Sequence, residues 1–214
     1  RDTVIICGGR NIDECYSLTS EKATLVTHMS VGRRYAASIV LNDNTLWVTG
    51  GYHYNYGGYL ASTDYVKMTG TMPGPDLPMA LHHHAMVAIN RTCSMVIGGV
   101  FYAGYSIDYP ASTFFYDHNE GEWITGPSLI QGRQRLAAGI VTDEVTGEHF
   151  VAVTGGYHSG SYLDSTEILQ GGNWVQGKIS NTICHILEVF WSHNTITPSP
   201  WFLEKVVLTK NRIT

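Results

Sequence analysis

Four glycine pairs, each directly after a short apolar run, divide the first 177 residues of the chain into similar units. The pairs are Gly8-Gly9, Gly50-Gly51, Gly98-Gly99 and Gly155-Gly156. Successive pairs begin 42, 48 and 57 residues apart. A fixed anchor with a varying period indicates one repeated structural unit whose loops differ in length. Because glycine permits close backbone approach and positive φ, we expect the pairs to lie where neighbouring sheets converge.

The repetition extends beyond the glycines. The hexapeptide at 48–53 recurs unchanged at 153–158, and the segment 59–64 is echoed by 162–167 and more weakly by 109–114. Each echo contains a Ser-Thr step followed by β-branched or aromatic residues. Each unit is therefore predicted to contain four short strands: one before the apolar run, the run itself, the Ser-Thr segment and a last strand.

Tryptophan marks the last strand in two of the units. Trp123 and Trp174 hold equivalent places, whereas Thr71 stands where the second unit should have its tryptophan. The first strands are predicted at 36–41, 85–89 and 137–142. The abundance of glycine (23) and tyrosine (13), with only 14% charged residues, is typical of short strands joined by tight turns.

The ordered set of motifs resembles the Kelch-repeat β-propeller family over residues 1–177. The amino-acid sequence of the motifs is similar to that of uncharacterised invertebrate Kelch proteins. The resemblance implies an all-β fold. It implies a partial Kelch-type β-propeller with three complete four-stranded blades and an incomplete N-terminal blade that starts in its second strand. Each tryptophan is then expected to cover the seam between adjacent sheets.

The repeat pattern ends after Gly177. Residues 178–214 share nothing with it and are interpreted as a non-repeat C-terminal tail, with a short helix expected at 183–191. Kelch propellers are expected to have more blades than this sequence provides. We therefore interpret the chain as a fragment, or as a variant with a replaced C-terminal end.

The loops after the glycine pairs contain the candidate binding residues. All of them leave the same end of the second strand, so we expect them to line one face. Tyrosine mixed with glycine, serine and asparagine is the combination that antibody loops use for recognition. The predicted contact residues are Tyr52, His53, Tyr54, Tyr56, Tyr59, Phe101, Tyr102, Tyr105, Tyr109, Tyr157, His158 and Tyr162. The competing interpretation is that some of these rings only pack between blades.

These loops predict a non-enzymatic module that binds a protein partner and uses no cofactor. A net charge of −5 argues against nucleic acid as the partner, and no stretch approaches the ~20 apolar residues of a membrane span. One alternative is the substrate-recognition module of a cullin-type ubiquitin ligase adaptor, similar to BTB-Kelch proteins, which requires an upstream BTB domain. Another is a Kelch-fold radical copper oxidase or a hydrolase.

The enzyme alternatives depend on candidate metal ligands. His82 and His84 alternate along a predicted strand, but no cysteine or carboxylate is spaced to complete a four-ligand site. Copper chemistry requires a set of His, Tyr and Cys ligands, and His53, His158 and Cys93 form no such set in the sequence. No metal is therefore predicted.

Two carboxylates, Asp64 and Glu167, occupy equivalent places in non-adjacent units. Glycoside hydrolysis requires two carboxyl groups about 5–9.5 Å apart, which such a separation does not provide. We expect each carboxylate to pair locally.

Basic residues precede the first strands. Arg34, Arg133 and Arg135 are expected to pair with loop carboxylates or to contact an acidic partner. In this register, His84 occupies the place of Tyr35 and Leu136 and is expected to pack within the repeat.

Two features bear on the cellular compartment. Cys7 and Cys15 lie on predicted neighbouring antiparallel strands, so they are candidates for a disulfide. Residues 90–92, Asn-Arg-Thr, form a glycosylation sequon in a predicted turn. Both favour an extracellular setting. Reduced cysteines in a cytoplasmic domain remain the alternative.

Overall fold

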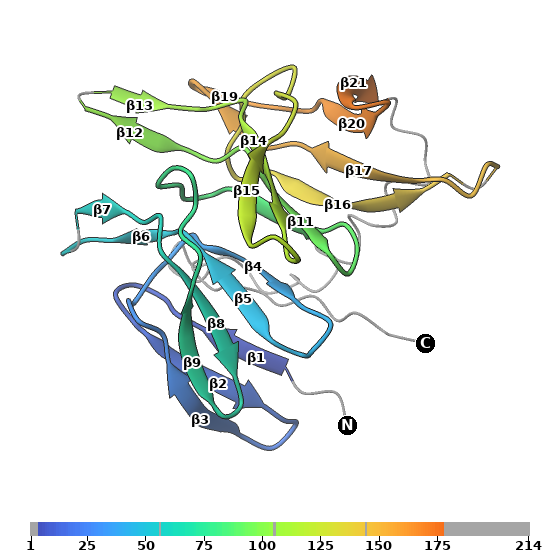
Figure 1. The fold of residues 1–214 in the computed structure, drawn as a ribbon. Coiled ribbons are helices and arrows are strands. Elements are labelled where there is room, and N and C mark those ends of the chain that lie inside the picture. The colour runs from blue at the N-terminus through green and yellow to red at the C-terminus, as the bar shows by residue number, and fades with distance from the viewer. Residues whose placement is uncertain (1–3, 56, 105, 144, 178–214) are drawn as a thin grey trace.

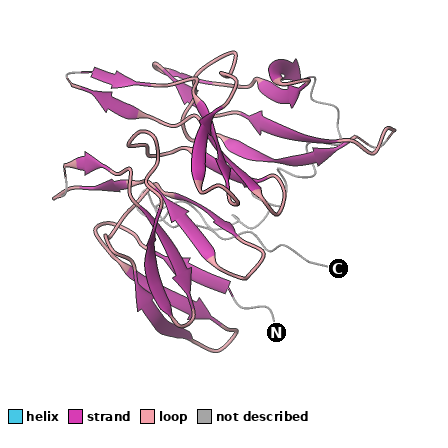
Figure 2. Ribbon diagram, viewed as in Figure 1, coloured by secondary structure: helices cyan, strands magenta, loops and turns pink. Residues whose placement is uncertain are grey.

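A computed structural model describes residues 4–55, 57–104, 106–143 and 145–177, and every regular element among them is a strand (Figures 1 and 2). The predicted all-β class is confirmed. The tail at 178–214, including the helix expected at 183–191, lies outside the described residues.

The strands form four main antiparallel sheets, which follow one another along the chain. The first sheet has the strands β1 (Val4–Cys7), β2 (Glu14–Leu18) and β3 (Ala23–His28). The second has β4 (Ala37–Val40), β5 (Leu46–Thr49), β8 (Thr63–Lys67) and β9 (Gly70–Gly74). The third has β10 (Ala85–Ala88), β11 (Cys93–Ile97), β14 (Thr113–Asp117) and β15 (Glu122–Thr125). The fourth has β16 (Ala137–Thr142), β17 (His149–Thr154), β20 (Thr166–Gln170) and β21 (Asn173–Gly177).

Three short hairpins interrupt the sheets after the glycine pairs. They are β6 (Tyr52–His53) with β7 (Gly58–Tyr59), β12 (Phe101–Ala103) with β13 (Ser106–Asp108), and β18 (Tyr157–His158) with β19 (Ser161–Tyr162). The sequence predicted loops at these places. The hairpins therefore give the candidate binding residues a more regular support than expected.

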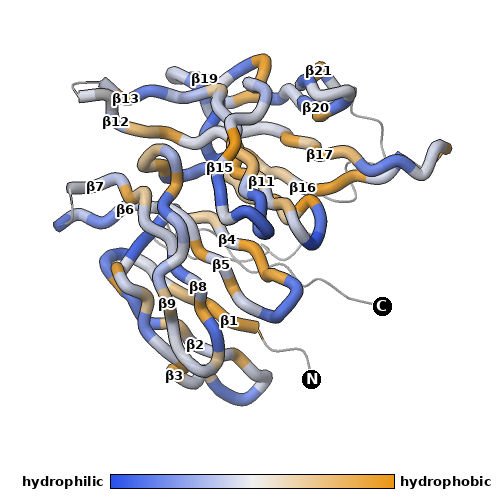
Figure 3. Tube along the Cα trace, in the orientation of Figure 1, coloured by the Kyte–Doolittle hydropathy of each residue, from blue (hydrophilic) through white to orange (hydrophobic). Residues whose placement is uncertain are grey.

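Apolar clusters fill the spaces between consecutive sheets. Strands β1, β16 and β17 contain hydrophobic stretches, while the turns are mostly hydrophilic (Figure 3). Trp47 on β5 is fully buried and contacts the rings of Tyr116 and Trp123 from the third sheet. Trp174 on β21 packs in the cluster between the third and fourth sheets and donates its Nε1–H to the Pro127 carbonyl at 3.0 Å. Trp174 thus covers a seam as expected.

The glycine pairs lie where one sheet meets the loop that leads into the next. We call the segment before the first strand of a sheet its leading loop. In three of the pairs, the second glycine donates its N–H to a backbone carbonyl in the leading loop of the following sheet. The hydrogen bonds run from Gly9 to the Arg33 carbonyl at 3.1 Å, from Gly51 to the Leu81 carbonyl at 2.8 Å and from Gly99 to the Arg133 carbonyl at 2.8 Å. A Cβ on the first glycine would collide with the same carbonyl; on Gly98, with φ of +60°, it would lie 2.5 Å from the Arg133 oxygen. Close approach therefore requires glycine here.

The leading loop of the second sheet aligns one residue differently from the sequence-based register, whereas the predicted match of His84 to Leu136 is confirmed. Antiparallel bridges join Arg34 to Tyr52, His82 to Val100 and Gln134 to Tyr157. Arg34, His82 and Gln134 therefore hold equivalent positions in the three leading loops. His84 is therefore equivalent to Ala36 and Leu136, and its predicted match to Tyr35 is wrong.

Three residues with positive φ link successive leading loops. Tyr35, His83 and Arg135 have φ of 59°, 55° and 54°. His83 donates its N–H to the Tyr35 carbonyl at 2.9 Å, and Arg135 donates to the His83 carbonyl at 2.9 Å. The first strands follow this order, with β4 beside β10 and β10 beside β16.

Candidate functional site

Two of the hairpins lie side by side and border an open aromatic cavity. The hairpins β6–β7 and β12–β13 extend from the same side of the molecule (Figure 1). The cavity has a volume of about 750 Å³ and is lined by Tyr52, Tyr54, Gly57, Gly58, Tyr59, Ala80, Phe101, Tyr102 and Ile107. None of the lining residues that the structure describes is charged, and the Arg34 guanidinium lies 5.1 Å from the centroid of the lining Tyr52 ring. The volume lies within the range of ligand-binding pockets, about 300–1,000 Å³.

Tyr59 is the centre of the aromatic contacts around this cavity. Its ring stacks on His82, with centroids 4.6 Å apart, and lies parallel to Tyr102 at 6.1 Å. Burial raises the pKa of the Tyr59 phenol, so its hydroxyl remains neutral and able to donate a hydrogen bond. Tyr102 is half exposed, which leaves one face of the stack open to solvent.

Leading-loop residues form the base of this cluster. His82 and His83 share a hydrogen bond between their Nδ1 atoms at 2.6 Å, and His83 stacks on Tyr35 at 4.0 Å. Burial lowers the pKa of His82 to about 4 and that of His83 to about 3, so both rings are neutral near pH 7. The Arg34 guanidinium lies 4.9 Å from the Tyr35 ring centroid. A fixed positive charge therefore adjoins neutral rings.

The sequence reasoning missed the contribution of these residues. Tyr35, His82 and His83 precede the first strands, so they were not grouped with loops that follow the second strands. The aromatic and imidazole rings at positions 35, 82 and 83 could have indicated this contribution. They can be assigned to the site only when the leading loops are correctly aligned.

A second aromatic cluster forms around the fourth sheet. The ring centroids of Tyr109 and His158 are 5.4 Å apart, and those of Tyr157 and Tyr162 are also 5.4 Å apart. His158 donates its Nδ1–H to the Gly132 carbonyl at 2.7 Å. Tyr162 is 84% exposed. This cluster adjoins the first, because Tyr109 is among the groups that raise the pKa of the Tyr59 phenol, after burial.

The remaining predicted contact residues differ in exposure. Tyr54 is 75% exposed at the mouth of the first cavity, and Phe101 is half-buried in its wall. His53 is buried and accepts the backbone N–H of Asn55 at its Nδ1, so in this conformation it supports the hairpin instead of facing solvent. Tyr56 and Tyr105 lie outside the described residues.

The candidate metal ligands are separated. His84 is buried, and its Nε2 lies 2.9 Å from Thr49 Oγ1 in the interior, whereas His82 faces the aromatic cluster. Burial lowers the pKa of His84 to about 3. Cys93 begins β11, at the far end of that strand from the glycine pair. Within the part of the chain that the structure describes, no three His, Cys, Asp or Glu side chains are grouped to hold a metal ion.

The two equivalent carboxylates are held in buried ion pairs. Asp64 pairs with Arg33 at 2.7 Å and Glu167 with Arg133 at 2.6 Å. Local pairing of the carboxylates matches the expectation, but the partner of Asp64 is Arg33, whereas the sequence analysis singled out Arg34. Cys7 and Cys15 face each other across β1 and β2, are buried, and are joined by a disulfide.

Comparison with known proteins adds no family. The sequence matches no protein-family model, and no curated protein matches it significantly. None of the described segments forms a helix with the length and hydropathy that a membrane crossing requires.

Proposed function

We propose that the chain is part of a Kelch-type β-propeller that binds a protein partner through its aromatic cavity without catalysing a reaction. The propeller interpretation is supported by three sheets with the same sequential strand order, by their adjacent first strands, and by the glycine pairs at the seams. The resemblance to Kelch repeats supplies the family hypothesis.

The single observation that carries the binding proposal is the uncharged aromatic cavity between β6–β7 and β12–β13. Tyrosine offers a large amphipathic contact area with little conformational entropy to lose. Tyr54 and Tyr102 are exposed, and Tyr59 lies parallel to Tyr102. Exposed parallel rings, among described lining residues that carry no charge, favour a short apolar or proline-containing peptide segment, because such segments dock in aromatic grooves.

The test uses a displayed random peptide library as its probe. The chain is panned against the library, and the selected peptides are titrated against the wild type and against a Tyr54→Ser/Tyr102→Ser variant. We expect uncharged apolar or proline-rich peptides, and a loss of about tenfold or more in affinity for the variant.

A matched control replaces two exposed apolar side chains on the outer strands, Met72→Ser on β9 and Ile124→Ser on β15. This variant should retain the affinity of the wild type. If the library yields no binder, or if the selected peptides bind the tyrosine variant as tightly as the wild type, the proposed binding site is wrong.

A further inference from the structure

The turn between β10 and β11 presents the sequence Asn90-Arg91-Thr92 to solvent, with all three residues exposed. It is the one Asn-x-Ser/Thr sequence in the 214 residues. The turn precedes β11, whereas Gly98-Gly99 follows that strand, so the turn and the aromatic cavity lie at opposite ends of the third sheet.

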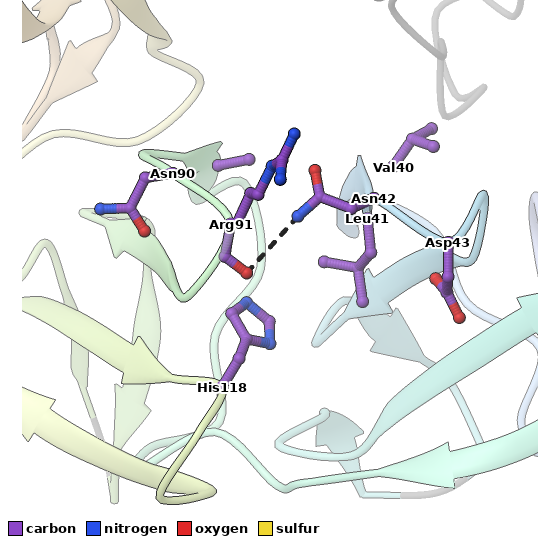
Figure 4. Close-up of a pocket in the computed structure, with 8 residues that line it drawn as sticks. Val40, Leu41, Asn42, Asp43, Asn90, Arg91 and His118 are labelled. Carbon is purple, nitrogen blue, oxygen red and sulfur yellow. Dashed lines mark hydrogen bonds between the residues drawn. The ribbon is translucent and has the colours of Figure 1, made fainter.

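The Asn90 side chain stabilises this turn through its oxygen alone. Asn90 Oδ1 accepts the backbone N–H of Thr92 at 2.8 Å and the Thr92 hydroxyl at 3.1 Å. In contrast, Asn90 Nδ2 donates no hydrogen bond to any residue that the structure describes. Figure 4 shows the Asn90 amide directed away from the other labelled side chains, while Asn42 faces the Arg91 carbonyl at 3.4 Å. The nitrogen is therefore both accessible and uncommitted.

The disulfide between Cys7 and Cys15 supplies an independent observation. Disulfides form and persist in oxidising compartments such as the endoplasmic reticulum, and they are rare in the cytosol. N-linked glycans are added in the same compartment, to asparagine in this sequence context. Two unrelated features on different sheets thus indicate one environment.

We propose that Asn90 is an N-glycosylation site and that the protein matures in the secretory pathway. The donor is an oligosaccharide linked to a lipid pyrophosphate. Asn90 Nδ2 forms a bond to C1 of the first sugar and loses one proton, the C1–oxygen bond to the pyrophosphate breaks, and the lipid pyrophosphate leaves. Oδ1 takes no part in the new bond, so both hydrogen bonds to Thr92 are retained after modification.

The position of the glycan also fits the proposed binding face. A bulky sugar at the β10–β11 turn is solubilising and remains at the end of the sheet away from Tyr59 and Tyr102. The glycan therefore covers the opposite end of the sheet and leaves the aromatic cavity accessible. This inference does not depend on the proposed function, because glycan attachment is measured without any partner.

The test expresses the 214-residue chain behind a cleavable secretion leader in cultured eukaryotic cells. The wild type is compared with Asn90→Gln, Thr92→Ala and Thr92→Ser, and each is treated with peptide N-glycosidase before electrophoresis and peptide mass mapping. We expect a glycosidase-sensitive species for the wild type and Thr92→Ser, and complete loss of it for the other two variants.

The serine variant is the matched control, because it differs from the alanine variant by one hydroxyl and retains the acceptor sequence. Addition to the chain accompanies synthesis, so the same four sequences translated with microsomes give a readout that does not depend on folding. Wild-type chain that carries unmodified Asn90 in both systems overturns the proposal. Unmodified Asn90 in the protein isolated from its natural source also overturns it.

Discussion

Arg133 donates to the carboxylate of Glu167 at 2.6 Å, and both side chains are almost fully buried in the fourth sheet. The guanidinium also donates to the carbonyls of Gly155 and Ser165 at 2.9 Å each. The carboxylate accepts the backbone N–H of Ile130 at 2.7 Å. The pair therefore ties the leading loop of the sheet to its second and third strands.

The second sheet repeats this arrangement with a shorter carboxylate. Arg33 donates to Asp64 at 2.7 Å and to the carbonyls of Gly50 and Ser62, and Asp64 accepts the N–H of Ser30 at 3.2 Å. Burial lowers the pKa of Arg33, and Asp64 acts in the opposite direction. The interaction is thus a feature of the repeat and does not arise by chance in one sheet.

The third sheet replaces every member of this interaction together. Leu81 stands in place of the arginine, Phe114 in place of the carboxylate, and both lie in one apolar cluster. Pro78 stands where Ser30 or Ile130 supplies the N–H. Because proline has no N–H, the apolar version leaves no donor without its acceptor at this position.

Arg133→Leu should therefore destabilise the protein by about 3–5 kcal/mol, since it leaves the Glu167 carboxylate buried without its counter-ion. The triple variant Ile130→Pro/Arg133→Leu/Glu167→Phe copies the third sheet and should recover most of that loss. Urea unfolding followed by tryptophan fluorescence measures both. A triple variant no more stable than the single one would show that the two versions are not interchangeable.

Sequence patterns predicted the four units and their strands but not this interaction. The glycine pairs and Ser-Thr steps report backbone constraints, and the strands predicted at 36–41, 85–89 and 137–142 begin within one residue of β4, β10 and β16. The ion pair depends on the alignment of the leading loops. There the left-handed residue is Tyr35, His83 or Arg135, not glycine, so no conformational signal marks it.

The candidate site was predicted in part for the same reason. Tyr54, Tyr59 and Tyr102 lie in the segments that follow the glycine pairs, and this position identifies them in the sequence. The imidazole base at His82 and His83 comes from another part of each repeat, and only the folded backbone brings it beneath the tyrosines. Burial of His53 depends on how the β6–β7 hairpin turns, which composition does not specify.

Gly98→Ala should destabilise the protein by several kcal/mol. A Cβ at this position meets the Arg133 carbonyl oxygen at 2.5 Å, in addition to the cost of a left-handed backbone, about 1–2 kcal/mol for a residue other than glycine. Gly171→Ala provides the control, because Gly171 has nearly the same φ, +59°, with no atom near its Cβ. Thermal unfolding should show a much larger loss for Gly98→Ala. Equal losses would mean that backbone conformation alone explains the glycine pairs.

Acid should weaken the fold from about pH 6.5 downward. Burial lowers the pKa of His84 from 6.5 to about 3. Between these two pH values the imidazole is protonated in the unfolded chain and neutral in the folded chain. The histidine contribution is complete above pH 6.5 and is lost as the pH falls toward 3, by about 1.4 kcal/mol per pH unit for one such group. His84→Leu installs the residue found at the equivalent position 136 and should reduce this slope. Unfolding in urea at a series of pH values measures it.

His149→Gln is the matched control for the pH series, because it removes an exposed histidine at the start of β17. Its stability should follow the wild-type curve between pH 6.5 and 4. If His84→Leu also follows that curve, the buried imidazole is not the source of the acid sensitivity.

Removal of the Cys7–Cys15 disulfide should destabilise the first sheet. The bond closes a loop with a sequence separation of 8, for which the lost chain entropy corresponds to roughly 2–3 kcal/mol. Both cysteines belong to the apolar cluster between the first and second sheets, so Cys7→Ala/Cys15→Ala also removes packed sulfur atoms.

Hydrogen exchange in the Cys7→Ala/Cys15→Ala variant should increase most in β1 and β2, because these are the strands that the bond joins. Cys93→Ala, which removes the half-buried free thiol on β11, should leave exchange in β1 and β2 unchanged. Uniform exchange across all four sheets in the double variant would contradict a local role for the disulfide.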